Sequence, residues 1–471
     1  MKVTQVSICP TDAATAAGSP ALTPELLAAS GARYSRNNEG LESILDKIDP
    51  KHMDRSVDGI FRMLDYGHQS IADMVPVAMF MDGLSMWLAY YVWTLCPVAG
   101  GQESSTRYID FGIDSLVDPD LLGIDDDQRN AWMARMKESL VAYDEALAIW
   151  QVIGERWPER TRIPPELLHD EDPKVRRKVE RMRRNYGFDR ARYYLPSAIA
   201  TNVMLVMSAR AWATLCQHLA SHALPEAQRL GAMICEQLAL CAPRLIKHAT
   251  RTASVEQGLA RVFAAWQAQA AAGLPMELQP GAASTDRECA AQLQVTPAPG
   301  VDTAVFASDL EHHDNRYAWI GEELKRTAVR FSWNGVTFAE IRDLNRHRTG
   351  NKYCPLVPQG FYSALDEVPE GAGEMEAALL RLNERGRQAT AEAYGRLAAG
   401  DPTFVYWLPL GTQFLFEHLS TADKFIYEAE LRTGTGAHYR YAGHLHDALE
   451  LWYEACPGTR DCILEGAAEP E

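Results

Sequence analysis

Arg346-His347-Arg348, followed by Thr349-Gly350-Asn351-Lys352-Tyr353, is the stretch on which the interpretation of this 471-residue chain rests. Residues 336–345 precede it, and their apolar side chains recur at helical spacing, which predicts a helix. Strong donors that leave a helix C-terminus into a glycine-containing loop suit an anion or a planar heterocycle. Basic residues are also favourable beside the negative end of a helix dipole, so a solvated helix end is the other interpretation.

Length and composition predict a soluble protein of two domains. A chain of 471 residues exceeds what one core usually spans, and 47% apolar residues are enough for large cores. The net charge of −17 argues against a nucleic-acid polymer as partner. Nine scattered cysteines without a CxxC pair are typical of a reduced protein that has no structural zinc site, so no metal is expected.

The compartment is expected to be the cytoplasm. No apolar run is as long as a membrane span, so no membrane partner is expected. Residues 1–5 lack the apolar core of a signal peptide.

The coarse pattern along the chain is mostly helical. Helices are expected from residue 22, with Thr23 as N-cap and Pro24 at the first helical position. Residues 75–80 read as a strand that Pro76 would confine to a sheet edge, and residues 83–85 as the start of an aromatic helix. Long charged helices are expected over 125–180 and apolar helices over 202–245.

A second polar motif follows Gly100-Gly101. The run Gln102-Glu103-Ser104-Ser105-Thr106-Arg107-Tyr108 combines hydroxyls, a guanidinium and a carboxylate. Such a loop suits a phosphate and a sugar hydroxyl, although an ordinary polar loop has the same composition.

Features of the first half recur in the second half in the same order. Leu408-Pro409 and Thr421-Ala422-Asp423 echo Leu195-Pro196 and Ser208-Ala209-Arg210 at identical spacing. A long-period repeat predicts two copies of one domain, over residues 1–253 and 309–471, with a linker at 254–308. We expect an α+β fold in which each copy is a helix-rich domain around a small sheet and the copies form a pseudo-dimer.

Both halves resemble the flavin-dependent thymidylate synthases, whose signature is Arg-His-Arg, a short loop and Ser-x-Arg. The second half keeps Arg346-His347-Arg348 but continues with residues 354–362, which contain no Ser-x-Arg. The first half keeps residues 103–108 but reads Thr94-Leu95-Cys96 where Arg-His-Arg belongs. The signature is therefore divided between the two halves.

The division continues downstream of the signature. An arginine that in the family helps to hold the nucleotide matches Arg192 in the first half and Val405 in the second. The arginine that polarises the pyrimidine matches Arg432, whereas residues 219–222 contain none. The flavin-facing Asn-Ala-Arg is similar to Ser208-Ala209-Arg210, and the family's His-x-Ser is similar to His68-x-Ser70. Complementary losses of this kind predict one composite site built by both halves.

The resemblance implies transfer of a methylene group from methylenetetrahydrofolate to carbon 5 of deoxyuridylate, with reduced FAD as hydride donor and NADPH as reductant. It implies no cysteine nucleophile, and it assigns Arg432 the catalytic role of stabilising negative charge on the uracil. A homodimer would match the tetramer of the family's single domains. The expected flavin contacts are Arg346, His347, Arg348, Arg210, Ser208, His68 and Ser70. The expected nucleotide contacts are Glu103, Ser104, Ser105, Arg107 and Arg192.

Two departures and two alternatives accompany this prediction. Asp343 replaces a glutamine that helps to hold the nucleotide in the family, and the loop ending at 360–362 is not the family's. A carboxylate near the uracil would change which pyrimidine or one-carbon donor is accepted. The chain is alternatively a catalytically silent protein that binds flavin or nucleotide, or a helical scaffold whose motifs are coincidental.

Overall fold

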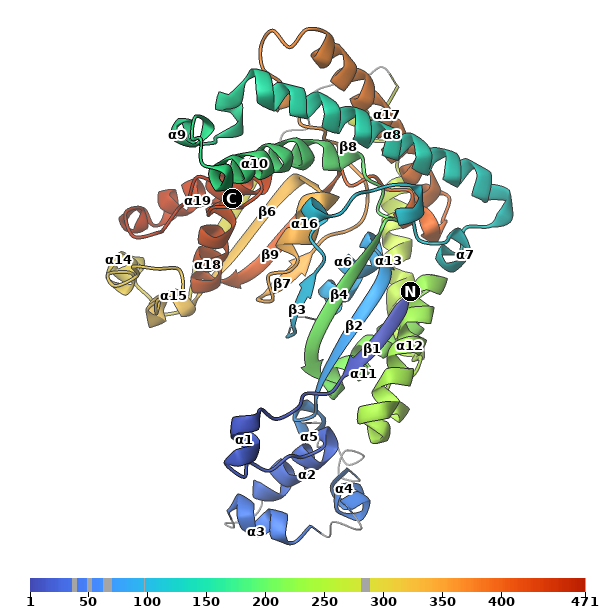
Figure 1. The fold of residues 1–471 in the computed structure, drawn as a ribbon, viewed down its shortest axis with the longest axis vertical. Helices are drawn as coiled ribbons and strands as arrows, with labels where there is room; N and C mark the ends of the chain where they lie inside the picture. The colour runs from blue at the N-terminus through green and yellow to red at the C-terminus, as the bar shows by residue number, and fades with distance from the viewer. Residues whose placement is uncertain (36–39, 49–52, 62–69, 97, 281–288, 471) are drawn as a thin grey trace. The chain divides into compact units, whose positions relative to one another are not determined.

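The structure, a computed structural model, describes residues 1–35, 40–48, 53–61, 70–96, 98–280 and 289–470 (Figure 1). It is an α+β protein with two antiparallel sheets, as expected. Two compact units are each assembled from several segments. Unit 1 comprises 1–105, 116–125 and 199–263, and unit 2 comprises 106–115, 126–198 and 264–471.

The sheet of unit 1 has the strand order β1(Lys2–Val6), β2(Pro76–Ser85), β4(Ala200–Ser208), β3(Gly100–Glu103). The edge position predicted from Pro76 is wrong, because β2 pairs with both β1 and β4. Pro76 is tolerated there because it is the first residue of the strand. The helix predicted from residue 202 is also wrong at its start. Burial alternates along β4, as in a strand, and a short apolar run does not distinguish the two by itself.

The helix predicted with Thr23 as N-cap and Pro24 at its first position is α2. Pro24 opens α2, and Ser85 caps α6 by accepting a hydrogen bond from the Leu88 backbone N–H. The helix expected at 83–85 therefore begins at Met86, since these three residues still belong to β2. The unit's helices are α1(Asp12–Ala16), α2(Pro24–Tyr34), α3(Leu41–Asp46), α4(Met53–Phe61), α5(Ser70–Asp73), α6(Met86–Leu95), α7(Pro119–Leu122), α11(Ala209–Ala220) and α12(Pro225–Cys241).

The sheet of unit 2 has the order β5(Ala291–Pro297), β6(Thr327–Thr337), β9(Thr412–Thr421), β7(Asn351–Tyr353), and β8(Gly360–Phe361) also pairs with β9. Its long helices α8(Asp126–Arg156) and α10(Pro173–Ala191) pack together, and α17(Glu374–Ala398) packs on α8 (Figure 1). The remaining helices of the unit are α9(Pro165–Leu168), α14(Phe306–Asp309), α15(Glu322–Lys325), α16(Phe338–Leu344), α18(Ala422–Thr433) and α19(Tyr439–Ala455).

The segment expected to be a linker is largely structured. Residues 254–308 contain most of α13(Ala253–Ala271) and the whole of β5. The compact units are interleaved along the chain instead of dividing at this segment. The tandem boundaries at 253 and 309 stay a prediction.

The two sheets share one strand order, β1-β2-β4-β3 and β5-β6-β9-β7. In each sheet the second strand carries a register shift, between Asp82 and Leu84 or between Trp333 and Val336. Each of these strands then leads directly into a helix, α6 or α16. The order of features that echoed in the sequence is thus also the order of elements in the fold.

The two echoing Leu-Pro segments pair with each other inside unit 2. Pro196 lies opposite Pro409 in an antiparallel bridge. The Ser197 N–H donates to the Leu408 carbonyl at 2.9 Å, and the Leu410 N–H donates to the Leu195 carbonyl at 2.8 Å. The exchange is symmetric, because each segment offers the same relative donor and acceptor.

No helix among the described residues is long and apolar enough to cross a membrane.

Candidate functional site

Helix α16 carries the residues before Arg-His-Arg, and a capping box fixes its start. Thr337 Oγ1 accepts from the Glu340 N–H at 3.3 Å, and Glu340 Oε2 accepts from the Thr337 N–H at 2.8 Å. The helix predicted over 336–345 begins two residues later because residues 336 and 337 finish β6. It ends at Leu344, so that Arg346 leaves from its C-terminus as predicted.

The loop after Arg348 is held against β9 by Gly350. Its φ is +68°, and a Cβ there would lie 2.1 Å from the Leu419 carbonyl oxygen and 2.9 Å from His418 Nε2. Only glycine fits such a conformation at such a distance. Lys352 Nζ donates to the His347 carbonyl and closes the turn.

Arg432, in the last turn of α18, contacts the C-terminal end of α16 and the loop that follows it. Its Nε donates to His347 Nε2 at 2.7 Å, and its Nη2 donates to the Asp343 carbonyl oxygen at 2.9 Å. Since Nε2 accepts, the neutral imidazole carries its proton on Nδ1. Burial is the main cause that lowers the pKa of His347, Glu428 opposes it and Arg432 adds to it, so that the pKa is about 3.

Behind His347 lies a fully buried carboxylate. Glu428 Oε2 is 2.9 Å from His418 Nδ1, and His418 Nε2 is 2.7 Å from the Thr349 carbonyl oxygen. Burial raises the pKa of Glu428, but His347 and His418 outweigh it and leave the pKa at about 2. The carboxylate of Glu428 is therefore ionised, and its charge favours the protonated form of His347, the imidazole that accepts from Arg432.

The first half of the chain contributes two arginines to the same unit. Arg107 Nη2 and Nε bind Asp189 at 2.6 and 3.2 Å, and Arg107 Nη1 donates to the Gly436 carbonyl oxygen at 3.1 Å. Arg192 Nη1 lies 3.5 Å from Asp343 Oδ2. Its Nε and Nη2 are buried and have no hydrogen-bond partner among the described residues. A buried guanidinium with two unused donors needs an acceptor.

Asp343 is the anion around which these cations gather. Its Oδ1 pairs with Arg346 Nη2. Burial alone would raise the pKa of this carboxyl, but Arg346, Arg192, Arg432 and Arg342 together hold it well below its usual range. Unit 2 thus brings Arg107, Arg192, Arg346 and Arg432 together around two carboxylates, those of Asp189 and Asp343. The excess of cations predicts an anionic ligand.

The other predicted flavin contacts lie apart from this cluster. In unit 1, Arg210 Nη1 binds Asp73 Oδ2 at 2.8 Å, and Ser208 Oγ donates to Asp73 Oδ1 at 3.3 Å. Ser70 opens the short helix α5, which ends at Asp73. Arg348 of unit 2 is exposed, and His68 lies outside the described residues.

Three predicted nucleotide contacts also belong to unit 1. Glu103 is buried and accepts from Trp93 Nε1 at 3.1 Å, which ties it to the fold. The Ser104 N–H donates to the Asn202 carbonyl oxygen at 2.9 Å, and Ser105 is exposed. Their role toward a ligand stays a prediction.

Sequence reasoning missed the supporting carboxylates Asp189 and Glu428. Asp189 lies one helical turn before Arg192, and Glu428 lies one turn before Arg432. These spacings do not predict the pairs that form, because Asp189 binds Arg107 and Glu428 pairs with His418. Acidic and basic residues at such spacings are common on helices, so the sequence contained no usable signal.

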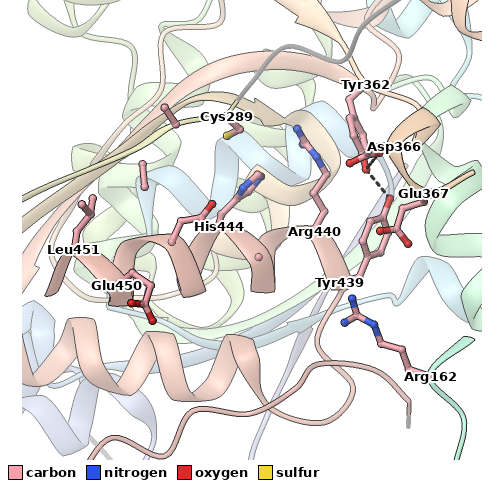
Figure 2. Close-up of a pocket in the computed structure, with 14 residues that line it drawn as sticks. Arg162, Cys289, Tyr362, Asp366, Glu367, Tyr439, Arg440, His444, Glu450 and Leu451 are labelled. Carbon is pink, nitrogen blue, oxygen red and sulfur yellow. Dashed lines mark hydrogen bonds between the residues drawn. The ribbon is translucent and has the colours of Figure 1, made fainter. Parts of the chain in front are cut away.

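A cavity of about 800 Å³ lies beside α19, and Figure 2 shows its labelled side chains. Arg440 projects from α19 over the Tyr362 ring at 3.6 Å and binds Glu340 Oε2 at 2.6 Å. His444 Nε2 lies 3.3 Å from Glu340 Oε1. The same Glu340 therefore caps α16 and anchors α19.

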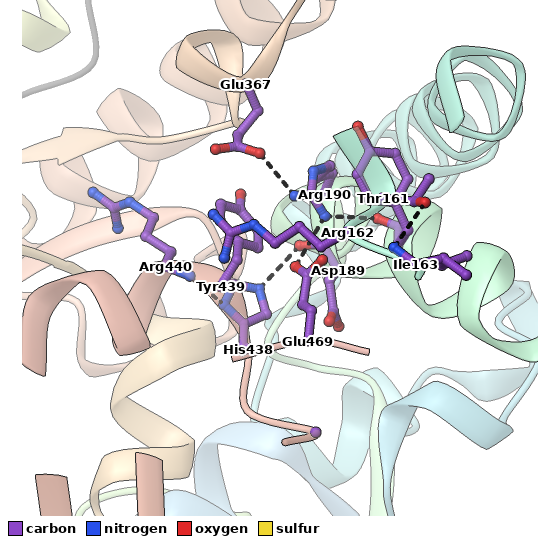
Figure 3. Close-up of polar contacts among 12 residues, drawn as sticks. Thr161, Arg162, Ile163, Asp189, Arg190, Glu367, His438, Tyr439, Arg440 and Glu469 are labelled. Atoms are coloured by element: carbon purple, nitrogen blue, oxygen red, sulfur yellow. Dashed lines mark hydrogen bonds and ion pairs between the residues drawn. The ribbon is translucent and has the colours of Figure 1, made fainter. Parts of the chain in front are cut away.

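Arg190 fixes the neighbourhood of Asp189 (Figure 3). Its buried guanidinium binds Glu367 at 2.7 Å and Glu469 at 3.3 Å. It lies between the rings of Tyr186 and Tyr439, at 3.8 and 4.1 Å from their centroids. A buried cation bound by two carboxylates and two rings is a rigid support beside the Asp189–Arg107 pair.

Among the described residues, no three potential metal-ligating side chains gather in one place. The fold defines the chain as an α+β protein whose unit 2 holds a cluster of arginines around Asp189 and Asp343. Residues 21–244 match the family model described as thymidylate synthase complementing protein, which confirms the predicted resemblance over that part of the chain.

Two curated relatives are similar to about half of the chain. The UPF0159 protein Ta1429 of Thermoplasma acidophilum is 23% identical over 253 residues, which are 49% of this chain and 51% of that protein. The flavin-dependent thymidylate synthase of Clostridium tetani is 21% identical over 227 residues, which are 48% of this chain and 82% of that protein. The chain thus spans about half the length of the first relative.

Proposed function

We propose that the chain is an FAD-dependent thymidylate synthase-like enzyme. It would methylate carbon 5 of a uracil nucleotide, deoxyuridylate, with methylenetetrahydrofolate as carbon donor and NADPH as reductant. The observation that carries this proposal is the meeting of Arg107 and Arg192 with Arg346 and Arg432 in one compact unit. The family match over residues 21–244 supports the same class.

The nucleotide phosphate fits the unused donors of Arg192. Phosphate oxygens accept from Arg192 Nε and Nη2, which are buried and otherwise unpartnered among the described residues. Arg107 is held by Asp189 and Gly436, so its place is fixed before a ligand arrives. Ser105 of unit 1 stays a predicted nucleotide contact by resemblance.

Arg432 is the proposed catalytic residue. A guanidinium against a uracil carbonyl stabilises the negative charge that develops when carbon 5 attacks the methylene donor. His347 is a positioning residue in this scheme, because its Nε2 accepts from Arg432 Nε and no longer faces a ligand freely. Being neutral, His347 does not compete with Arg432 for negative charge.

The remaining cations and hydroxyls suit the flavin. Bound and reduced FAD supplies the hydride in this chemistry. Arg346 and Arg348 of unit 2 would bind its ring and phosphates. Ser70, Ser208 and Arg210 of unit 1 stay predicted flavin contacts by resemblance, and Ser208 and Arg210 both bond to Asp73.

The proposal includes two tandem domains, at 1–253 and 309–471, and a homodimer in the cytoplasm. The shared strand order of the two sheets supports the repeat. So does the symmetric exchange between residues 195–197 and 408–410. Sedimentation equilibrium of the purified protein tests the dimer, and a monomer at micromolar concentration would argue against it.

The activity is tested by the absorption spectrum of the purified protein, followed by anaerobic reduction. The reduced protein is then mixed with deoxyuridylate, with methylenetetrahydrofolate, and with both. Flavin that reoxidises only with both substrates is the expected result. Flavin that binds but never turns over would favour a silent binder, and a protein that takes up no flavin would contradict the proposal.

A further inference from the structure

Asp343 contacts three arginines of the cluster. Its Oδ1 pairs with Arg346, its Oδ2 lies 3.5 Å from Arg192 Nη1, and its carbonyl oxygen accepts from Arg432 Nη2. One side chain at the end of α16 therefore occupies donors of two arginines that come from different halves of the chain.

The carboxylate of Asp343 lies beside Arg192, the residue proposed to bind the nucleotide phosphate. The five N–H donors of a guanidinium lie in one rigid plane. A phosphate on Arg192 Nε and Nη2 is thus within a few ångströms of the carboxylate that binds Nη1 of the same group. Two anions so close repel each other, and burial leaves their repulsion poorly screened.

Protonation does not relieve this repulsion near neutral pH. The surrounding arginines hold the pKa of Asp343 well below its usual range, so the carboxylate stays ionised. In the family that the chain resembles, a glutamine occupies this position, whose amide is neutral and whose side chain is one methylene longer. The exchange of glutamine for aspartate therefore introduces a negative charge and shortens the side chain, and asparagine is the neutral residue of the same shape as aspartate.

We infer that Asp343 is a specificity-determining residue, whose charge opposes a phosphate bound by Arg192 and so weakens the preference for deoxyuridylate over uracil nucleosides with less negative charge at the 5′ position. The inference rests on the proposed function. It concerns the 5′ end of the substrate, while the pairing of Asp343 with Arg346 adjoins a proposed flavin contact.

The test uses three ligands that share the nucleoside and differ at the 5′ position, where deoxyuridine is neutral, deoxyuridine 5′-methylphosphate singly charged and deoxyuridylate mostly doubly charged. Isothermal titration of the full-length protein compares the wild type with Asp343→Asn and Asp343→Gln. We expect the amide variants to bind deoxyuridylate about tenfold or more tightly than the wild type, because a like-charge contact has gone. Deoxyuridine should be nearly unaffected, and the singly charged methylphosphate should fall between them.

Two controls isolate the position from the change of net charge. Glu450→Gln removes one charge from an exposed carboxylate that pairs with Arg460, and it should leave all three affinities unchanged. Asp343→Glu retains the charge and should retain the wild-type order of affinities. Thermal unfolding of each variant shows whether it is folded.

Three outcomes would overturn the inference. The first is unchanged or weaker deoxyuridylate binding in both amide variants, which would leave the proposed function standing. The second is a wild-type affinity for deoxyuridylate at least a thousandfold higher than that for deoxyuridine. This outcome is measured on the wild type alone, so it does not depend on whether the variants fold. The third is a wild type that binds none of the three ligands, which would remove the proposed function as well.

Discussion

At the scale of single residues, burial decides which groups are charged. His347 and Glu428 are both buried, but the first is neutral and the second ionised near neutral pH. Burial disfavours the charged form of both groups, and it prevails at His347, whereas at Glu428 the imidazoles of His347 and His418 outweigh it. Together they present Arg432 in one orientation, with a backbone carbonyl on its Nη2 and His347 on its Nε.

Arg432→Lys should lower the rate of flavin reoxidation by about 100-fold or more, because a lysine cannot reach His347, Asp343 and the uracil together. Rapid-mixing single-turnover kinetics measure this rate, with deoxyuridylate binding measured separately. Arg326→Lys, an exposed arginine paired with Glu323, is the matched control. A variant at position 432 with a wild-type rate and wild-type binding would exclude Arg432 from the chemistry.

His444 should make stability depend on pH above neutrality. Burial lowers its pKa, but Cys289 and Glu340 raise it to about 9, well above the ordinary value of 6.5, and Asp447 also faces it. The folded state therefore holds the proton more tightly than the unfolded state. Its contribution is complete below pH 6.5 and is lost as pH rises through 9, by about 3 kcal/mol at most.

Urea unfolding of wild type and His444→Gln between pH 6 and 10 measures that loss. The wild type should lose stability over this range, and the variant should lose clearly less. His446→Gln, which changes a more exposed histidine paired with Glu465, should keep the wild-type slope. Parallel curves for wild type and His444→Gln would refute the assignment.

At the scale of elements, two short structures hold the site: the capped helix α16 and the turn at Gly350. The cap uses Glu340, which also binds Arg440 and His444 of α19. The turn presses the loop after Arg-His-Arg onto β9 beside His418. Each element thus joins the site to the sheet of unit 2.

Gly350→Ala should destabilise the fold and weaken ligand binding, since its Cβ would overlap the Leu419 carbonyl oxygen. We expect a loss of several kcal/mol, more than the roughly 1 kcal/mol for a left-handed backbone alone. Gly371→Ala is the matched control, because Gly371 also has a positive φ of +84° but has open space around it. Urea unfolding compares them, and equal losses would show that the contact with β9 is unimportant.

At the scale of the whole molecule, residues far apart in the sequence form one cluster inside unit 2. Arg107 donates to the carbonyl of Gly436, so the first half contacts the loop that follows α18. The supporting pair Arg107–Asp189 is also internal to that unit. The contacts of Arg107 with Asp189 and Gly436 are therefore made within one chain.

Mixing two inactive variants tests this arrangement. Arg107→Ala and Arg432→Ala, co-expressed with different tags and purified as a mixed dimer, should remain as inactive as each variant alone. Each chain then carries a defect in its own site, so no intact site forms. Recovery of a substantial fraction of wild-type activity in the mixture would show that the two arginines act across chains.

Local spacing was sufficient to predict α2 with its Thr23–Pro24 start and the helix that delivers Arg346, because helix caps and apolar periodicity are short-range properties. The α+β class was expected for the two similar halves and not from local spacing, which gave a mostly helical pattern. The resemblance over 21–244 likewise needed only residue order. Tertiary structure alone placed Pro76 in an inner strand and made residues 200–208 a strand, since pairing partners lie far away in the sequence. It alone joined Arg192 to Asp343 and Glu428 to His418, because the charge of a buried group depends on neighbours that only the folded chain brings within a few ångströms.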